Sequence, residues 1–233
     1  MAIPDRFIID QEPDSREVNL LDALSQKFCG LKSLVFDDSG CVPLEPLDGE
    51  NRPRRYKDAL EGVLQTVEYT LETMETNGAY LLSKLSHPPL INLSKLVLSW
   101  NGSEDYYNMT SINFGTRMPR LQAVELTVLN FRLHHVHHEQ PRGAVTVQTL
   151  SLELRTTDFN LALLNSLFPN VSALNLTLNG PWPQRPTKWT FAPITAICRN
   201  WPGLEEVKIA GPVTCLSRDY DADLCGISRA ECC

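Results

Sequence analysis

The stretch Phe168-Pro169-Asn170-Val171-Ser172-Ala173-Leu174-Asn175-Leu176 decides how this 233-residue sequence is expected to fold. Val171, Leu174 and Leu176 form a six-residue pattern of one apolar residue, two variable, one apolar, one variable and one apolar. The last three positions alternate, which places the apolar side chains on one face of a β-strand. Pro169 suits a residue that precedes a strand and would not fit inside one. The stretch therefore predicts a strand that buries one face.

The same pattern recurs on both sides of this stretch. Its copies are Leu31-Leu34-Phe36, Leu93-Leu96-Leu98, Leu121-Val124-Leu126, Val147-Leu150-Leu152, Val171-Leu174-Leu176 and Leu204-Val207-Ile209. Pro119 and Pro202 repeat the position of Pro169. Most copies begin 24 to 33 residues after one another, near the roughly 20–29 residues of a leucine-rich repeat. One such strand cannot bury its apolar face alone, whereas strands stacked in parallel share a continuous core.

Parallel strands need a return segment, which is normally a helix. One-sided apolar spacing predicts helices over 158–168 and 190–200, with a weaker turn over 109–118 and an opening helix over 18–28. The predicted fold class is α/β. We expect a curved leucine-rich-repeat solenoid with parallel inner strands, outer helices and about six irregular repeats.

The main irregularity is the 62-residue interval between Leu31 and Leu93. It contains a strong helical pattern over 54–74 and a shorter one over 79–86. The segment 41–46 cannot be a central strand, because each of its two prolines removes a ladder donor. We interpret the interval as one repeat with an enlarged helical return, the alternative being a degenerate repeat that the pattern does not reveal.

Three regions follow from these patterns. Residues 1–27 form an N-terminal segment with the opening helix, 28–211 the leucine-rich-repeat solenoid, and 212–233 an irregular tail that contains cysteines. The tail shows no periodicity.

The repeats resemble those of F-box-type leucine-rich-repeat proteins, which have ribonuclease-inhibitor-like repeats. The resemblance covers about 28–211, and the stretch 168–176 is its closest phrase. It implies repeats that select the substrate of a ubiquitin ligase, with an F-box that docks a Skp1-type adaptor. Ile3 to Ile9 echoes the start of an F-box, but the rest of the F-box pattern does not follow, so such a domain would lie upstream. The alternative is a stand-alone leucine-rich-repeat scaffold or adaptor.

The variable strand positions are expected to line the concave face of such a solenoid. The central column is Val35, Val97, Glu125, Ser151, Asn175 and Lys208. The flanking columns are Ser33, Lys95, Ala123, Thr149, Ala173 and Glu206, then Asp37, Ser99, Thr127, Glu153, Thr177 and Ala210. A wide shallow surface of this kind suits protein recognition better than a small-molecule pocket. Solvated strand faces are also polar where no partner binds.

Three long segments follow strands and are expected to emerge on one rim: 100–108, 130–143 and 180–189. Insertions on one side of a repeat array often form its binding face. Their aromatic residues are the type that dominates interfaces, and the candidates are Trp100, Tyr106, Tyr107, Trp182 and Trp189. The alternative for Trp182 and Trp189 is that they fold back and cap the core.

Net charge, hydropathy and cysteine count limit the classes of partner and the cell compartments that we expect. The net charge of −7 argues against a nucleic-acid partner. The sequence shows no apolar run near the roughly 20 residues of a membrane span and no signal-peptide order, so we expect a cytoplasmic or nuclear protein without a membrane partner. Seven cysteines, an odd count, favour free thiols over a disulfide framework.

We expect no enzyme, cofactor or metal site. The sequence lacks a nucleophile elbow, a phosphate-binding glycine loop and a zinc-protease motif. The histidine-rich segment His134 to His138 invites a metal interpretation. Adjacent side chains on a strand point to opposite faces, so these imidazoles would not converge on one ion.

Overall fold

The computed structural model describes residues 6–9, 30–36, 52–76, 82–83, 86, 88–101, 111–130, 144–154, 161–178, 197, 199–210 and 229–232. The strands are β1 (Arg6–Ile9), β2 (Ser33–Phe36), β3 (Thr73–Thr76), β4 (Lys95–Asn101), β5 (Ala123–Asn130), β6 (Thr149–Leu154), β7 (Ala173–Leu178), β8 (Glu206–Ala210) and β9 (Arg229–Cys232). The helices are α2 (Arg52–Val67), α5 (Phe114–Arg117) and α6 (Leu161–Leu167).

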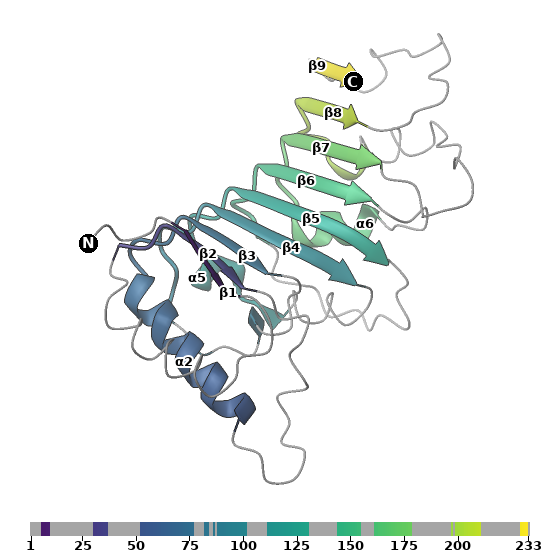
Figure 1. Ribbon diagram of the computed structural model, residues 1–233. Coiled ribbons are helices and arrows are strands. Elements are labelled where there is room, and N and C mark those ends of the chain that lie inside the picture. Colours follow the sequence, from purple (N-terminus) through teal and green to yellow (C-terminus); the bar gives the residue numbers. More distant parts are fainter. Residues whose placement is uncertain are drawn as a thin grey trace, which may run out of the picture.

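The nine strands in the described part of the chain form one sheet, in which their order follows the chain. Every neighbouring pair is parallel, from β1 with β2 to β8 with β9. Figure 1 shows the strands side by side in a twisted row, with α5 and α6 behind the sheet and α2 near its N-terminal end. The protein is therefore of the α/β class, and all six strands that the repeated pattern predicts are present.

The interval between Leu31 and Leu93 contains a strand, so the prediction of one repeat with an enlarged helical return is wrong. Helix α2 ends at Val67, and β3 pairs in parallel with both β2 and β4. Met74, which the helical pattern places on the stripe of a helix, is instead a fully buried residue of β3. The alternative of a degenerate repeat hidden in this interval agrees with the extra strand.

Two further strands differ from the expectations. Strand β1 lies in the segment expected to carry an opening helix, and β9 lies in the tail expected to be irregular. Both join the same sheet at its two ends. The predicted opening helix over 18–28 lies outside the described residues, as does most of the helix predicted over 79–86.

The core lies between the sheet and its helices. From β2 to β8, each strand and the turn before it form one unit of the sheet. Three positions of each unit are buried: the residue two before the strand and two alternating positions within it. They are Leu31, Leu34 and Phe36; Leu71, Met74 and Thr76; Leu93, Leu96 and Leu98; Leu121, Val124 and Leu126; Val147, Leu150 and Leu152; Val171, Leu174 and Leu176; Leu204, Val207 and Ile209. Each buried leucine contributes about 1.5–3 kcal/mol relative to an exposed one, so these stacked rows are the main source of stability.

The helices complete this core by their apolar faces. In α2, Leu60, Val63, Leu64 and Val67 are buried at helical spacing, and a proline stands in its first turn, where no amide donor is needed. In α5, the Asn113 side chain caps the first turn by accepting from the Thr116 amide. Phe114 of α5 packs edge-on against Phe168, just after α6, with ring centroids 6.4 Å apart.

The chain enters successive strands through the same hydrogen bonds. The Lys32 carbonyl accepts the amides of Glu72 and Thr73, at 2.8 and 3.0 Å. The same double acceptance recurs at the carbonyls of Glu72, Ser94, Gln122, Gln148 and Ser172. Each unit from β2 to β8 is thus joined to the next by one pair of bonds at the edge where the strands begin, which we call the turn edge.

A β-turn precedes several of these strands. The amides of Leu93, Leu121, Val147 and Leu204 donate to the carbonyl three residues earlier, at 3.1–3.2 Å. Pro119 and Pro202 occupy the second position of such turns, where the fixed φ of proline is favourable. The recurring proline is therefore explained by the turn more specifically than by its position before a strand.

Candidate protein-recognition face

The variable positions of the strands lie in register across the sheet. The central column consists of residues that pair strand by strand: Val35, Glu75, Val97, Glu125, Ser151, Asn175 and Lys208. Each is half-buried except Lys208, which is exposed. Their buried neighbours in the strands point to the opposite side, because successive side chains of a strand alternate. All six central positions predicted from the sequence fall in this column.

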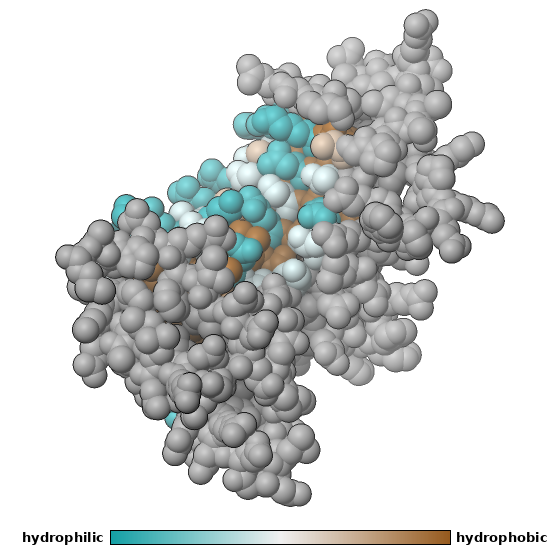
Figure 2. Space-filling model, in the orientation of Figure 1, coloured by the Kyte–Doolittle hydropathy of each residue, from teal (hydrophilic) through white to brown (hydrophobic). Residues whose placement is uncertain are grey.

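The flanking columns are also in register. The first is Ser33, Thr73, Lys95, Ala123, Thr149, Ala173 and Glu206, and the second is Ser99, Thr127, Glu153, Thr177 and Ala210. Asp37, predicted in the second column, lies outside the described residues. We call these three columns together the exposed face. Figure 2 shows hydrophilic and near-neutral residues over most of its described part, with small hydrophobic areas between them.

The sequence pattern does not identify Glu75 and Thr73, because both belong to β3. Glu75 pairs in register with Val35 on one side and Val97 on the other. A six-residue pattern that admitted threonine at its last position would have found this strand, since Leu71, Met74 and Thr76 occupy the three buried positions.

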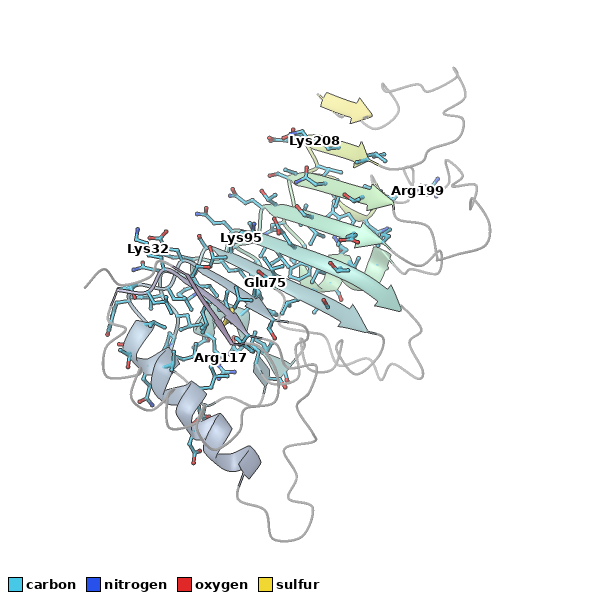
Figure 3. The ribbon with its side chains drawn as sticks, in the orientation of Figure 1. Lys32, Glu75, Lys95, Arg117, Arg199 and Lys208 are labelled. Atoms are coloured by element: carbon cyan, nitrogen blue, oxygen red, sulfur yellow. The ribbon has the colours of Figure 1, made fainter. Side chains whose placement is uncertain are left out.

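Ion pairs occur at two places on the exposed face, between β4 and β5 and within β8. The Lys95 ammonium lies 2.8 Å from a Glu125 carboxylate oxygen, and the Lys208 ammonium lies 2.7 Å from Glu206. Figure 3 shows the labelled Lys95 and Lys208 separated along the row of strands. These side chains are one-third to one-half exposed, so each pair contributes at most about 1 kcal/mol. Their charges are available to a partner at small cost.

The central column is uncharged between Glu125 of β5 and Lys208 of β8. Asn175 donates from its amide nitrogen to the Ser151 hydroxyl at 3.1 Å, which links β7 to β6. Ala123, Thr149 and Ala173 keep the adjoining column short. Toward the strand ends, the Thr127 hydroxyl donates to a Glu153 carboxylate oxygen at 3.5 Å. Donors and acceptors on short side chains leave room for another backbone to approach this part of the sheet.

Of the aromatic residues predicted on the rim, the structure describes only the backbone of Trp100. Trp100 lies in β4, and its backbone pairs with Val128 immediately before a register shift at Asn101. The position therefore stands where β4 ends, as the sequence predicts, but its side chain is not among those described. Tyr106, Tyr107, Trp182 and Trp189 lie outside the described residues, and so does the histidine segment 134–138.

Metal sites and membrane spans are two other features that the described residues could carry. No group of three or more histidine, cysteine or acidic side chains in the described ranges is arranged to hold a metal ion. Within the same part of the chain, no helix is long and apolar enough to cross a membrane.

Comparison with known proteins gives no relative. No protein-family model matches the sequence, no curated protein matches it, and no solved structure matches the fold.

Proposed function

We propose that the chain is a leucine-rich-repeat solenoid that recognises another protein, as the substrate-selecting repeats of an F-box-like ubiquitin ligase subunit. The observation that carries the recognition proposal is the exposed face, whose seven-residue central column pairs in unbroken register from Val35 to Lys208. Such a surface is extended and shallow, which suits a protein partner. The ligase assignment is supported by the sequence resemblance of 28–211 alone.

The solenoid proposal is supported by what recurs between strands. The same three buried positions and the same double acceptance at the turn edge accompany each unit from β2 to β8. In a solenoid each unit contacts mainly its neighbours and stacking extends one core. The chain order of the strands and their uniformly parallel pairing agree with that arrangement.

Affinity capture tests the ligase proposal. The full chain, fused at its N-terminus to any upstream F-box encoded with it, serves as bait in a eukaryotic lysate, and the captured proteins are identified by mass spectrometry. We expect a Skp1-type adaptor together with at least one further protein. Specific partners without the adaptor would replace the ligase proposal by a stand-alone scaffold or adaptor. Absence of any partner above an unrelated repeat protein of similar charge would count against recognition itself.

The rim aromatics give a second test. We expect Trp182→Ala combined with Trp189→Ala to reduce partner capture by about tenfold or more, because tryptophans anchor interfaces, while the melting temperature stays within about 2 °C of the parent protein. Differential scanning fluorimetry and quantitative capture are measured on the same samples. A lower melting temperature with unchanged capture would show instead that the two indoles cap the core.

A further inference from the structure

A hollow of about 550 Å³ opens on the turn edge, where the strands begin. It is lined by residues from three successive units: Gly30 and Lys32, then Tyr69, Thr70 and Glu72, then Asn92. Its size is in the range of ligand sites, which are however mostly apolar. Among the lining residues, Tyr69 is the single large apolar side chain. The hollow therefore suits a polar or charged group better than an apolar small molecule.

Hydrogen bonds between units fix the walls of this hollow. The Thr70 hydroxyl donates to the Leu31 carbonyl at 3.0 Å. The Asn92 side-chain amide donates to the Tyr69 carbonyl at 2.5 Å, and its oxygen accepts from Arg120 at 2.8 Å. Because these bonds tie each unit to the next, a ligand would meet a surface that is already formed, which lowers the cost of binding.

Tyr69 is unusual for its exposure. Tyr69 is 63% exposed, and among the described residues the other exposed large hydrophobic residue is Val145. Both lie two residues before the first buried residue of their unit. The carbonyl of Tyr69 accepts from the Asn92 side-chain amide, and that of Val145 accepts from the Asn170 side-chain amide. The Tyr69 hydroxyl bonds to Glu68, and this bond, with the negative charge of Glu68, raises the pKa of the phenol. The phenol therefore keeps its proton at physiological pH.

The turn that carries Tyr69 favours a cation over an anion. Its two charged residues, Glu68 and Glu72, are both acidic, and Glu72 lines the hollow, whereas the basic Lys32 and Arg120 belong to other units. The Lys32 ammonium lies 2.9 Å from a Glu72 oxygen, and both side chains are more than half exposed, so this pair can re-form around an incoming cation at small cost. A Cβ added at the lining residue Gly30 would meet nothing within 4 Å, so the approach to this residue is open.

We propose that this hollow binds an arginine side chain presented by a protein partner. A guanidinium stacks on an aromatic face and donates to a carboxylate in one plane, which matches Tyr69 beside Glu72. Figure 3 shows Lys32, which marks this site, at the N-terminal end of the row of strands, whereas Lys95 and Lys208 mark the exposed face. The proposal rests on the proposed function only in that the arginine belongs to a protein. It is independent of the exposed face.

The test titrates the isotope-labelled full chain with N-acetyl-arginine N-methylamide and follows amide shifts by NMR. We expect saturable shifts at Gly30, Tyr69 and the Asn92 side-chain amide. The citrulline analogue, which has nearly the same shape but no charge, is expected to bind about fivefold more weakly or worse, because cation–π attraction and the carboxylate pair contribute about 1 kcal/mol together. Equal binding of the two compounds, or no saturable shift at these residues, would overturn the proposal.

Single-residue variants distinguish a cation site from an anion site. We expect Tyr69→Leu and Glu72→Gln each to weaken arginine binding several-fold, and Lys32→Met to strengthen it, because the competing ammonium is removed from Glu72. The matched control is Val145→Ala, at the equivalent exposed turn position, which should leave binding unchanged. Weaker binding of the arginine derivative in Lys32→Met would contradict the proposal, because removal of a competing cation should not reduce the affinity for another cation.

The outcome is distinguishable from that of the proposed function, since these titrations use no partner. If arginine binds but no protein is captured, protein recognition fails while the cation site stands. If capture succeeds and the arginine derivative does not bind, the cation site alone fails.

Discussion

Leu174→Asp is expected to unfold the protein. Leu174 is fully buried in β7, in register between Leu150 of β6 and Val207 of β8, which are buried as well. Removing such a side chain costs about 2–5 kcal/mol, and placing an unpaired carboxylate there adds several more. The sum is comparable with the roughly 5–15 kcal/mol that separates folded from unfolded states in domains. Circular dichroism of the purified variant should show loss of the cooperative thermal transition.

The adjacent residue supplies the control. Asn175→Asp introduces the same charge one position along β7, on the exposed face and beside Lys208 of the next strand. In the parent protein the Asn175 amide donates to the Ser151 hydroxyl, and in the variant that hydroxyl can donate to the new carboxylate instead, so we expect the free energy of unfolding to change by less than about 0.5 kcal/mol. If Leu174→Asp melts like the parent protein, or if Asn175→Asp is the more damaging change, the assignment of buried and exposed faces is wrong.

Trp201→Ala is expected to have the second largest effect. Trp201 is 1% exposed, and its indole nitrogen donates to the Phe168 carbonyl of the preceding unit at 2.7 Å. Truncating a buried tryptophan costs about 3–5 kcal/mol, and the carbonyl also loses a donor, which adds about 1 kcal/mol or more. Urea unfolding should show a free energy of unfolding that is lower by this amount, with Arg199→Ala, an exposed residue nearby, as the neutral control.

Trp201→Phe separates packing from hydrogen bonding. The phenyl ring retains much of the buried area but has no donor for Phe168. We therefore expect a loss smaller than that of Trp201→Ala, at about 1–3 kcal/mol. A phenylalanine variant as stable as the parent protein would show that this hydrogen bond does not contribute to stability.

Six strands could be predicted because their buried positions are filled by large aliphatic or aromatic residues at fixed spacing. Leu174 and Leu176 show this pattern with polar residues around them. The exposed central column followed from the same alternation, since the position between two buried residues of a strand must face the other way.

Strand β3 escaped prediction for two physical reasons. Val67, Leu71 and Met74 are spaced by four and three residues, which is also the spacing of a helix stripe, so the end of α2 and the start of β3 form one continuous pattern. In addition, Thr76 occupies a position that is apolar in the six predicted strands, although it is only 2% exposed here. The boundary is set by the turn after Val67, where Thr70 and Leu71 both donate to the Val67 carbonyl.

The turn-edge hollow could not be predicted, because it depends on proximity between units. Gly30, Tyr69 and Asn92 are far apart in the sequence and meet through the stacking of their turns. Asn92 and Asn170 do have a recognisable position, one residue before the first apolar residue of the pattern. Their bonds to the preceding turn explain why an amide is useful there.

The most direct test of protein recognition by the exposed face is quantitative capture with a blocked face. Ser151→Arg combined with Asn175→Arg places two long side chains in the uncharged part of the central column, between Glu125 and Lys208. The matched control is Gln122→Arg combined with Gln148→Arg, which adds the same charge at exposed positions of the turn edge. We predict that the face variant keeps its melting temperature but captures about tenfold less partner, or even less, than the parent chain. The control variant should capture as much as the parent chain. Equal capture by a folded face variant would contradict the account.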